Sequence, residues 1–203
     1  MKYVIFSVIL FPAIVFAADF QNISDKDSNL KSGLVYGKDH SFFIDNPEGW
    51  ILDNTQGKEF GLLAVLYPKG SSFKSAESVM YENIATKSPE RGNNIEEIMR
   101  LDKLKFQKGK PEMRVSVGND IVTQDKKNAK VLIFSGDNLG IQTNEAVAYI
   151  DETKIVVLLV LSSQSEMSFK KAYPDFQKLV SSYGFFTDQV QFSKENKNSK
   201  PIK

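Results

Sequence analysis

The sequence predicts an α/β fold of the α+β kind, in which helices pack on a sheet. Two observations near the carboxyl end indicate this class. Residues 155–161 are seven consecutive apolar side chains rich in β-branched types, which favours a strand covered on both faces over a helix. The segment that follows has the periodicity of an amphipathic helix, so it supplies one of the two covers.

This closing helix is predicted from apolar residues spaced three and four positions apart, which share one face of a helix. The stripe consists of Phe169, Ala172, Tyr173, Phe176, Leu179, Val180 and Tyr183. Ser163 and Glu166 match a capping box at its start, and Gly184 fits a left-handed cap at its end. Pro174 conflicts with a continuous helix, so we expect either a kink there or a start near Tyr173.

The other elements are predicted from apolar runs and from the glycine, proline and asparagine residues between them. Strands are expected at 34–36, 40–44, 50–52, 61–67, 78–85, 113–117, 121–124, 131–134 and 145–150. Turns or loops are expected at 45–49, 68–70, 118–120, 126–130, 135–140 and 151–154, with a tight turn at 118–120. A first helix is expected at 93–108, with Asn93 or Asn94 as its cap.

Residues 1–17 have the features of a secretory signal peptide. Lys2 supplies a positive start, residues 3–16 are almost entirely apolar, and residues 15–17 fit a small-residue cleavage site after Ala17. The alternative is a membrane anchor, but the apolar run is shorter than the roughly 20 residues that a spanning helix needs. We therefore expect an exported protein, periplasmic or extracellular, with no stable membrane span after cleavage.

The rest of the chain is expected to form a single domain. Residues 18–32 are polar and predict a flexible lead-in, residues 33–187 the globular domain, and residues 188–203 a disordered tail. The tail is basic, because from residue 192 onward it holds four lysines and one glutamate. Neither a repeat nor a linker divides the central segment.

Composition excludes several kinds of chemistry. The chain has no cysteine, which excludes disulfides, thiol catalysis, cysteine-ligated zinc and acylation as a lipoprotein. Its formal net charge is +1, so nothing favours a nucleic-acid partner. His40 is the single histidine and no Gly-x-Ser-x-Gly motif occurs, which disfavours a serine hydrolase and a transition-metal site. We expect no cofactor, no metal and no catalytic residue.

Trp50 and His40 are the two candidate site residues. Trp50, the single tryptophan, follows a turn and precedes an apolar segment, so we expect it to anchor the core under the first hairpin. The alternative is that Trp50 and His40 lie on the rim of a ligand or partner site. His40 lies in a strand pattern, where a surface or packed residue is expected more often than a catalyst.

Residues 42–50, Phe-Phe-Ile-Asp-Asn-Pro-Glu-Gly-Trp, combine a strand with a Pro-x-Gly-Trp turn. Together with the strand–strand–helix unit at 146–186, they resemble the PsbP-like superfamily, which groups PsbP, MOG-type and DcrB-like proteins. The resemblance covers residues 42–186 and implies an α/β/α sandwich with a central, mostly antiparallel sheet of about six or seven strands and two main helices. It implies docking onto other proteins rather than an activity, and it assigns no functional residue.

The sequence therefore leaves three candidate functions. The first is an exported, non-enzymatic module that binds a protein or an envelope component. The second is a small-ligand binding protein with a cleft near Trp50. The third is a hydrolase that uses a pair of carboxylates, for which the 25 acidic residues offer many candidate pairs. The sequence does not identify the partner, the oligomeric state or a role for the basic tail.

Overall fold

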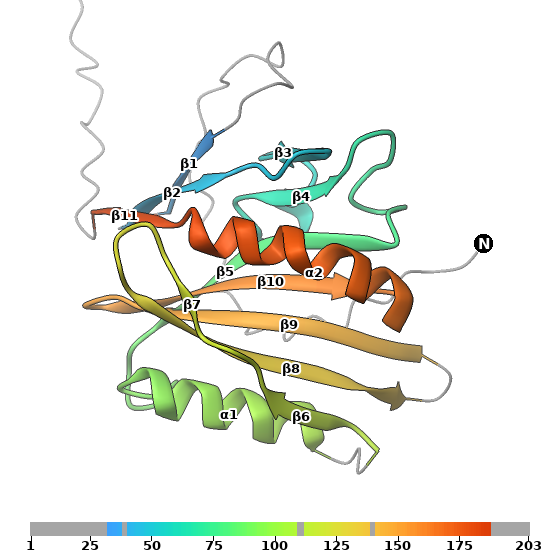
Figure 1. Cartoon of the computed structure of the whole chain (residues 1–203). Coiled ribbons are helices and arrows are strands. Elements are labelled where there is room, and N and C mark those ends of the chain that lie inside the picture. The colour runs from blue at the N-terminus through green and yellow to red at the C-terminus, as the bar shows by residue number, and fades with distance from the viewer. Residues whose placement is uncertain (1–31, 38–39, 109–111, 139–140, 188–203) are drawn as a thin grey trace, which may run out of the picture.

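The structure is a computed structural model that describes residues 32–37, 40–108, 112–138 and 141–187 (Figure 1). The predicted signal peptide 1–17, nearly all of the lead-in 18–32 and the tail 188–203 lie outside these residues. Within the described ranges, no helix has both the length and the apolar composition needed to cross a membrane.

A central sheet of seven strands in the order β3-β4-β5-β10-β9-β8-β6, with the short β7 also paired to β8, forms the middle layer. The strands are β3 (Trp50–Asp53), β4 (Val65–Pro68), β5 (Ser78–Thr86), β6 (Arg114–Val117), β7 (Ile121–Val122), β8 (Asn128–Asn138), β9 (Ile141–Asp151) and β10 (Ile155–Ser163). All of their pairings are antiparallel. The predicted antiparallel sheet is therefore confirmed.

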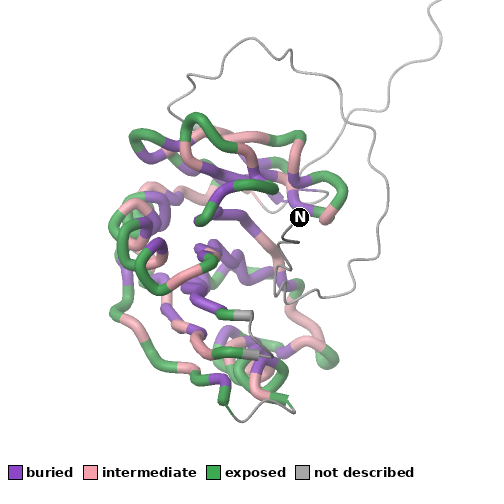
Figure 2. Tube along the Cα trace, turned by 90° about the vertical axis from the view of Figure 1, so that its right-hand side faces the viewer, coloured by how far each residue is buried: buried purple, intermediate pink, exposed green. Residues whose placement is uncertain are grey.

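Two helices, α1 (Ile95–Gln107) and α2 (Glu166–Ser181), cover opposite faces of this sheet, which confirms the sandwich (Figure 1). The strand β10 lies at the centre and is buried on both faces, as predicted. Val156, Leu158 and Val160 belong to the core under α1. The alternate side chains Val157 and Leu159 belong to the core under α2. Figure 2 shows buried residues along the inner strands and exposed residues at the turns.

The helix α1 begins where the sequence predicts. The Asn94 side chain caps it by accepting a hydrogen bond from the Glu97 N–H at 2.9 Å. Phe106 packs edge-on against Phe134 of β8, with ring centroids 4.8 Å apart. The buried face of α1 also carries Asp102, a carboxylate among apolar neighbours.

The capping box predicted at Ser163 is wrong. Ser165 caps α2, and its Oγ accepts a hydrogen bond from the Ser168 N–H at 3.1 Å. Ser163 instead belongs to the end of β10, where its hydroxyl lies 2.8 Å from that of Ser78 on β5. Pairing with β5 extends the strand past its apolar run, and the helix starts correspondingly later.

The helix α2 runs from Glu166 to Ser181 through Pro174, so the alternative of a start near Tyr173 is wrong. A proline inside a helix costs roughly 3 kcal/mol. The predicted stripe offsets this cost, because Phe176 and Leu179 are fully buried and each contributes about 1.5–3 kcal/mol.

Two further local predictions are wrong. Gly184 is not a left-handed cap: the helix ends at Ser181 with Ser182 as its cap, and Gly184 opens strand β11 (Gly184–Thr187). Residues 118–120 form no tight turn, because β6 and β7 pair with β8 and not with each other. The Gly118 N–H donates to the Val131 carbonyl at 2.9 Å, which keeps this segment along β8.

A second, three-stranded sheet of order β1-β2-β11 lies beside the end of α2 (Figure 1). Its other strands are β1 (Ser32–Tyr36) and β2 (Ser41–Asp45). The inner face of this small sheet joins the core under α2, and Phe42 contacts Tyr183 with ring centroids 5.2 Å apart. The turn predicted at 45–49 is confirmed, with Gly49 at a φ of 84°.

Candidate functional site

His40 is a packed residue directly before β2. It is 6% exposed, and its ring stacks on that of Phe42 with a centroid distance of 6.2 Å and an interplanar angle of 8°. A Cβ atom at Gly37 would lie 2.0 Å from the imidazole ring. The glycine therefore leaves the space that the histidine fills.

Trp50 is the first residue of β3 and is 5% exposed. Its indole N–H donates to Asp175 Oδ2 on α2 at 3.1 Å, and Lys178 lies 2.9 Å from the other carboxylate oxygen. The side chain thus joins an edge strand to the covering helix, which agrees with the interpretation of Trp50 as a core anchor. Two pockets in the described residues, a cavity under α1 and a surface hollow lined by Thr55, Gln56, Lys58, Glu59 and Lys74, include neither Trp50 nor His40, so a cleft beside them gains no support.

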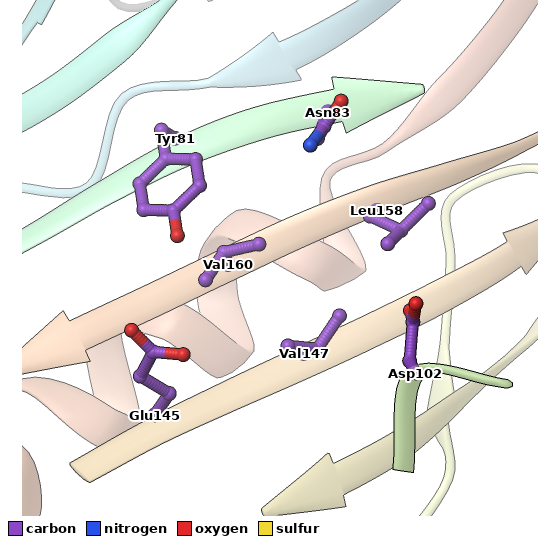
Figure 3. Close-up of a pocket in the computed structure, with 7 residues that line it drawn as sticks. All are labelled: Tyr81, Asn83, Asp102, Glu145, Val147, Leu158 and Val160. Atoms are coloured by element: carbon purple, nitrogen blue, oxygen red, sulfur yellow. The ribbon is translucent and has the colours of Figure 1, made fainter. Parts of the chain in front are cut away.

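A small cavity lies on the face of the central sheet that α1 covers, opposite the face covered by α2. It lies between α1 and strands β5, β10 and β9 (Figure 3). Its lining residues are Tyr81, Asn83, Asp102, Glu145, Val147, Leu158 and Val160. The strand register places Tyr81, Val160 and Val147 in one row across the floor. The cavity volume is about 20 Å³. One water molecule needs roughly 10–15 Å³ by this measure, so the space admits a single group of that size.

Two carboxylates from distant segments line this cavity. Asp102 from α1 is 1% exposed and accepts a hydrogen bond from the Tyr149 hydroxyl at 3.0 Å. Glu145 from β9 is also buried and accepts one from the Ser162 hydroxyl at 3.0 Å. In Figure 3 the Glu145 carboxylate and the Tyr81 hydroxyl point toward each other across Val160.

Burial dominates the electrostatics of the cavity. It raises the pKa of Glu145 to about 7, although the hydrogen bond from Ser162 acts in the opposite direction. It also raises the pKa of Asp102 to about 6, against the hydrogen bond from Tyr149 and the positive charge of Lys105. Both carboxyl groups therefore change protonation close to neutral pH.

The sequence does contain a signal for Asp102 and Glu145, although the apolar patterns of the helix and the strand were interpreted without it. Asp102 occupies a position of the α1 stripe, between Ile98 and Phe106, where an apolar residue is expected. Glu145 likewise alternates with Val147 and Tyr149 on the inward face of β9. A charged residue at an apolar position of each pattern marks a buried carboxylate.

Two other buried glutamates have stronger partners. Glu82 accepts hydrogen bonds from the backbone N–H groups of Leu63 at 2.6 Å and Ala64 at 3.3 Å. Glu152 pairs with Lys127 and accepts from the Tyr183 hydroxyl at 2.9 Å. Neither residue lines the cavity under α1.

Aromatic side chains are exposed on the outer face of the small sheet. Phe43 of β2 is 39% exposed and Phe186 of β11 is 61% exposed, and their rings meet edge-on at 5.6 Å. A bulge between Phe185 and Thr187 makes Phe186 an extra residue, which places its ring beside Phe43. Tyr36 of β1 is also exposed. We refer to Tyr36, Phe43 and Phe186 as the aromatic face.

The fold is similar to that of PsbP. The solution structure of cyanobacterial PsbP (CyanoP) from Synechocystis sp. PCC 6803 matches with a TM-score of 0.48 and 14% identity, over 83% of this chain and 98% of that one. The Ran-binding protein Mog1p of Saccharomyces cerevisiae matches with a TM-score of 0.47 and 12% identity, over 77% and 95% of the two chains. LpqN, involved in cell envelope biogenesis of Mycobacterium tuberculosis, matches with a TM-score of 0.46 and 14% identity, over 78% and 92%.

PsbP and a MOG-type protein are thus among the solved structures to which this chain is similar. At these TM-scores and identities, no conclusion about activity or partner follows from the neighbours. No protein-family model and no curated protein matches the sequence. The function is consequently inferred from this chain's own residues.

The cavity can hold a small polar or charged group, but not a whole organic substrate. Pockets for drug-sized ligands occupy roughly 300–1,000 Å³, whereas this cavity measures about 20 Å³. A sugar ring does not fit between Asp102 and Glu145 in this structure. In Figure 3 the two carboxylates lie toward opposite ends of the cavity lining, with Val147 between them, so they do not converge as a hydrolase would require.

Proposed function

We propose that this protein is an exported, non-enzymatic module that binds another protein through its aromatic face. The observation that carries the proposal is the contact between the exposed rings of Phe43 and Phe186 on the small sheet. Single exposed apolar residues are common on protein surfaces, but aromatic residues gathered on one sheet face are typical of interfaces. Buried aromatic anchors also dominate the binding energy of many complexes.

The fold supports this use of the small sheet. Phe42 and its inward-facing neighbours on β1 and β2 hold the sheet against the core under α2, so the outward side chains sit on a rigid support. Complete burial of an exposed phenylalanine side chain contributes about 1.5–3 kcal/mol, and Phe43 and Phe186, which are 39% and 61% exposed, would each contribute a part of this. The partner is therefore expected to present an apolar surface that accepts both rings.

Photo-crosslinking tests this proposal. A photoreactive phenylalanine analogue at position 43 or 186 is expected to yield the same adduct in cells, which mass spectrometry identifies. The analogue at Leu104, an exposed apolar residue on α1, is the matched control and is expected to yield no such adduct. Phe43→Ser and Phe186→Ser are each expected to weaken the complex roughly tenfold without unfolding the protein. Equal adducts from all three positions would contradict the proposal.

Export is the second part of the proposal and rests on residues 1–17. Mass spectrometry of the protein recovered from producing cells is expected to show an amino terminus at Ala18, in a periplasmic or extracellular fraction. A cytoplasmic protein that retains Met1 or Lys2 would contradict export, and it would leave the binding role of the aromatic face to be judged by the crosslinks.

A small-ligand binding function remains the second candidate. The specific observation that favours it is the cavity lined by Asp102 and Glu145, on the opposite side of the central sheet from α2 and the small sheet. It does not involve Trp50.

A further inference from the structure

We propose that the free edge of β6 binds an extended segment of another protein, which pairs with it as an additional antiparallel strand of the central sheet. The segment alternates apolar and polar side chains and carries an acidic residue opposite Arg114. This site is independent of the aromatic face, because β6 ends the central sheet on the side away from β3, whereas the small sheet lies beside α2 (Figure 1).

The opposite edge of the central sheet, formed by β3, is partly closed by its neighbours. The Asn46 side chain donates a hydrogen bond to the Trp50 carbonyl at 2.8 Å. A Cβ atom at Gly33 of β1 would lie 2.1 Å from the Leu52 side chain of β3, so the small sheet lies against this strand. The edge at β6 differs, because no strand lies beyond it in the described part of the chain.

The direction of the backbone groups of β6 follows from one hydrogen bond next to it. The Gly118 N–H donates to the Val131 carbonyl of β8 at 2.9 Å, in the register that the β6–β8 pairing already has. In an antiparallel pair, only every second residue turns its N–H and carbonyl toward the partner strand. Ser116 therefore bonds to β8, whereas the N–H and carbonyl groups of Val115 and Val117 point to the free edge.

The outward groups of Val115 and Val117 are available to an incoming strand. Two residues before Val115, the Met113 carbonyl accepts a hydrogen bond from the Gln107 side chain at 3.1 Å, which closes the edge there. Within the described ranges, no side chain or loop donates to or accepts from the backbone of Val115 or Val117. The Val117 side chain is 79% exposed. An unpaired edge of this kind is a template for pairing with another chain.

The side chains of β6 indicate the chemistry of the segment. Val115 packs partly against the core under α1, and Val117 projects from the same face, because alternate residues of a strand share a face. Arg114 and Ser116 project from the other face and are exposed. No acidic residue in the described ranges forms an ion pair with Arg114. Apolar residues opposite the valines and an acid opposite Arg114 therefore complement the strand.

A second copy of this chain complements β6 less well. A symmetric antiparallel pair that uses both outward residues is centred on Ser116. Arg114 of one copy then lies opposite Gly118 of the other, which supplies neither an acid nor an apolar side chain. The charge of Arg114 thus favours a segment of a different protein.

Nuclear magnetic resonance titration of the ¹⁵N-labelled protein with the peptide acetyl-Ser-Ile-Thr-Val-Glu-Ser-amide tests the proposal. In the antiparallel register, its isoleucine lies opposite Val117, its valine opposite Val115 and its glutamate opposite Arg114. Millimolar peptide is expected to shift the amide signals of Val115 and Val117 and to slow their hydrogen exchange.

N-methylation of the peptide distinguishes strand addition from other contacts. A methyl group on the peptide nitrogen of the valine removes the donor to Val115 and should weaken binding at least tenfold. The matched peptide with N-methyl threonine, whose nitrogen faces away from β6, should bind as the parent does. Equal binding of the two methylated peptides, or no shift at Val115 and Val117 with the parent peptide, would overturn the proposal.

Two variants of the protein test the edge from the other side. Arg114→Glu should weaken binding about fivefold, and a peptide with lysine in place of glutamate should restore it. Val117→Pro removes an outward donor and leaves the pairing with β8 intact, so it should abolish binding, whereas Val117→Thr keeps the donor and should bind. Phe43→Ser should not affect binding. Failure of the charge exchange, undiminished binding by Val117→Pro, or a dimer in sedimentation that Val117→Pro dissociates would refute the proposal, and none of these results bears on the aromatic face.

Discussion

At the scale of single residues, the four buried carboxylates in the described part of the chain differ in their hydrogen-bond partners. Glu82 uses backbone N–H groups and Glu152 uses a lysine and a tyrosine, whereas Asp102 and Glu145 each have one hydroxyl. The buried indole N–H of Trp50 also has a partner, because it donates a hydrogen bond to Asp175. The sequence predicted Trp50 as a core anchor, but the acceptor on α2 could not be predicted, since nothing local in the sequence links two segments so far apart.

Replacing Trp50 by phenylalanine is expected to lower the free energy of unfolding by about 1–3 kcal/mol, through lost packing and the lost hydrogen bond. Urea denaturation followed by circular dichroism measures the change. The control is Asp175→Asn, whose amide oxygen still accepts from the indole and which should cost less than about 1 kcal/mol. Equal stability of the Trp50→Phe variant and the natural chain would refute the role of Trp50 as an anchor.

At the scale of elements, periodicity predicted the two helices and the buried strand β10, because side-chain burial repeats with the backbone geometry. Helix starts were less predictable, since tertiary pairing competes with local capping. Ser163 carries a capping pattern, yet β10 continues through it because it pairs with Ser78 and Asn144. Asn93 and Asn94 are equivalent caps in the sequence, and only the structure distinguishes them.

The cap of α1 provides a matched pair of variants. Asn94→Ala is expected to lower the free energy of unfolding by about 1 kcal/mol, because the Glu97 N–H loses its acceptor. Asn93→Ala should change it by less than about 0.5 kcal/mol, since Asn93 contributes only its backbone N–H, which donates to Glu97 Oε2 at 2.7 Å. Thermal or urea unfolding of both variants measures the difference, and the reverse order would show that the cap is misassigned.

At the scale of the whole molecule, the sandwich class was predictable but the order of its strands was not. The sequence shows which faces are apolar, yet it does not show that β5 pairs with β10 across the intervening α1. The cavity depends on this order, because Tyr81 and Asn83 of β5, Glu145 of β9 and Asp102 of α1 meet only in the folded chain. The candidate site was therefore less predictable than the fold.

The buried carboxyls also predict how stability depends on pH. Burial raises the pKa of Glu82 and of Glu145 from 4.5 to about 7, and that of Asp102 from 3.8 to about 6. Groups whose pKa is raised in the folded state bind protons that the unfolded chain has released. Their stabilisation is thus complete below the unfolded pKa and is lost as the pH rises through the folded pKa. For each of the two glutamates, the free energy of unfolding is expected to fall by about 3 kcal/mol as the pH rises past the folded pKa.

The central claim for the α1 face is that Glu145 is buried without a compensating charge. The most direct test is the free energy of unfolding from about pH 4 to about pH 8, measured for the natural chain and for Glu145→Gln. We predict that the natural chain loses stability as the pH rises toward 7 and that the variant loses about 3 kcal/mol less. Parallel pH profiles for the two proteins would contradict the claim.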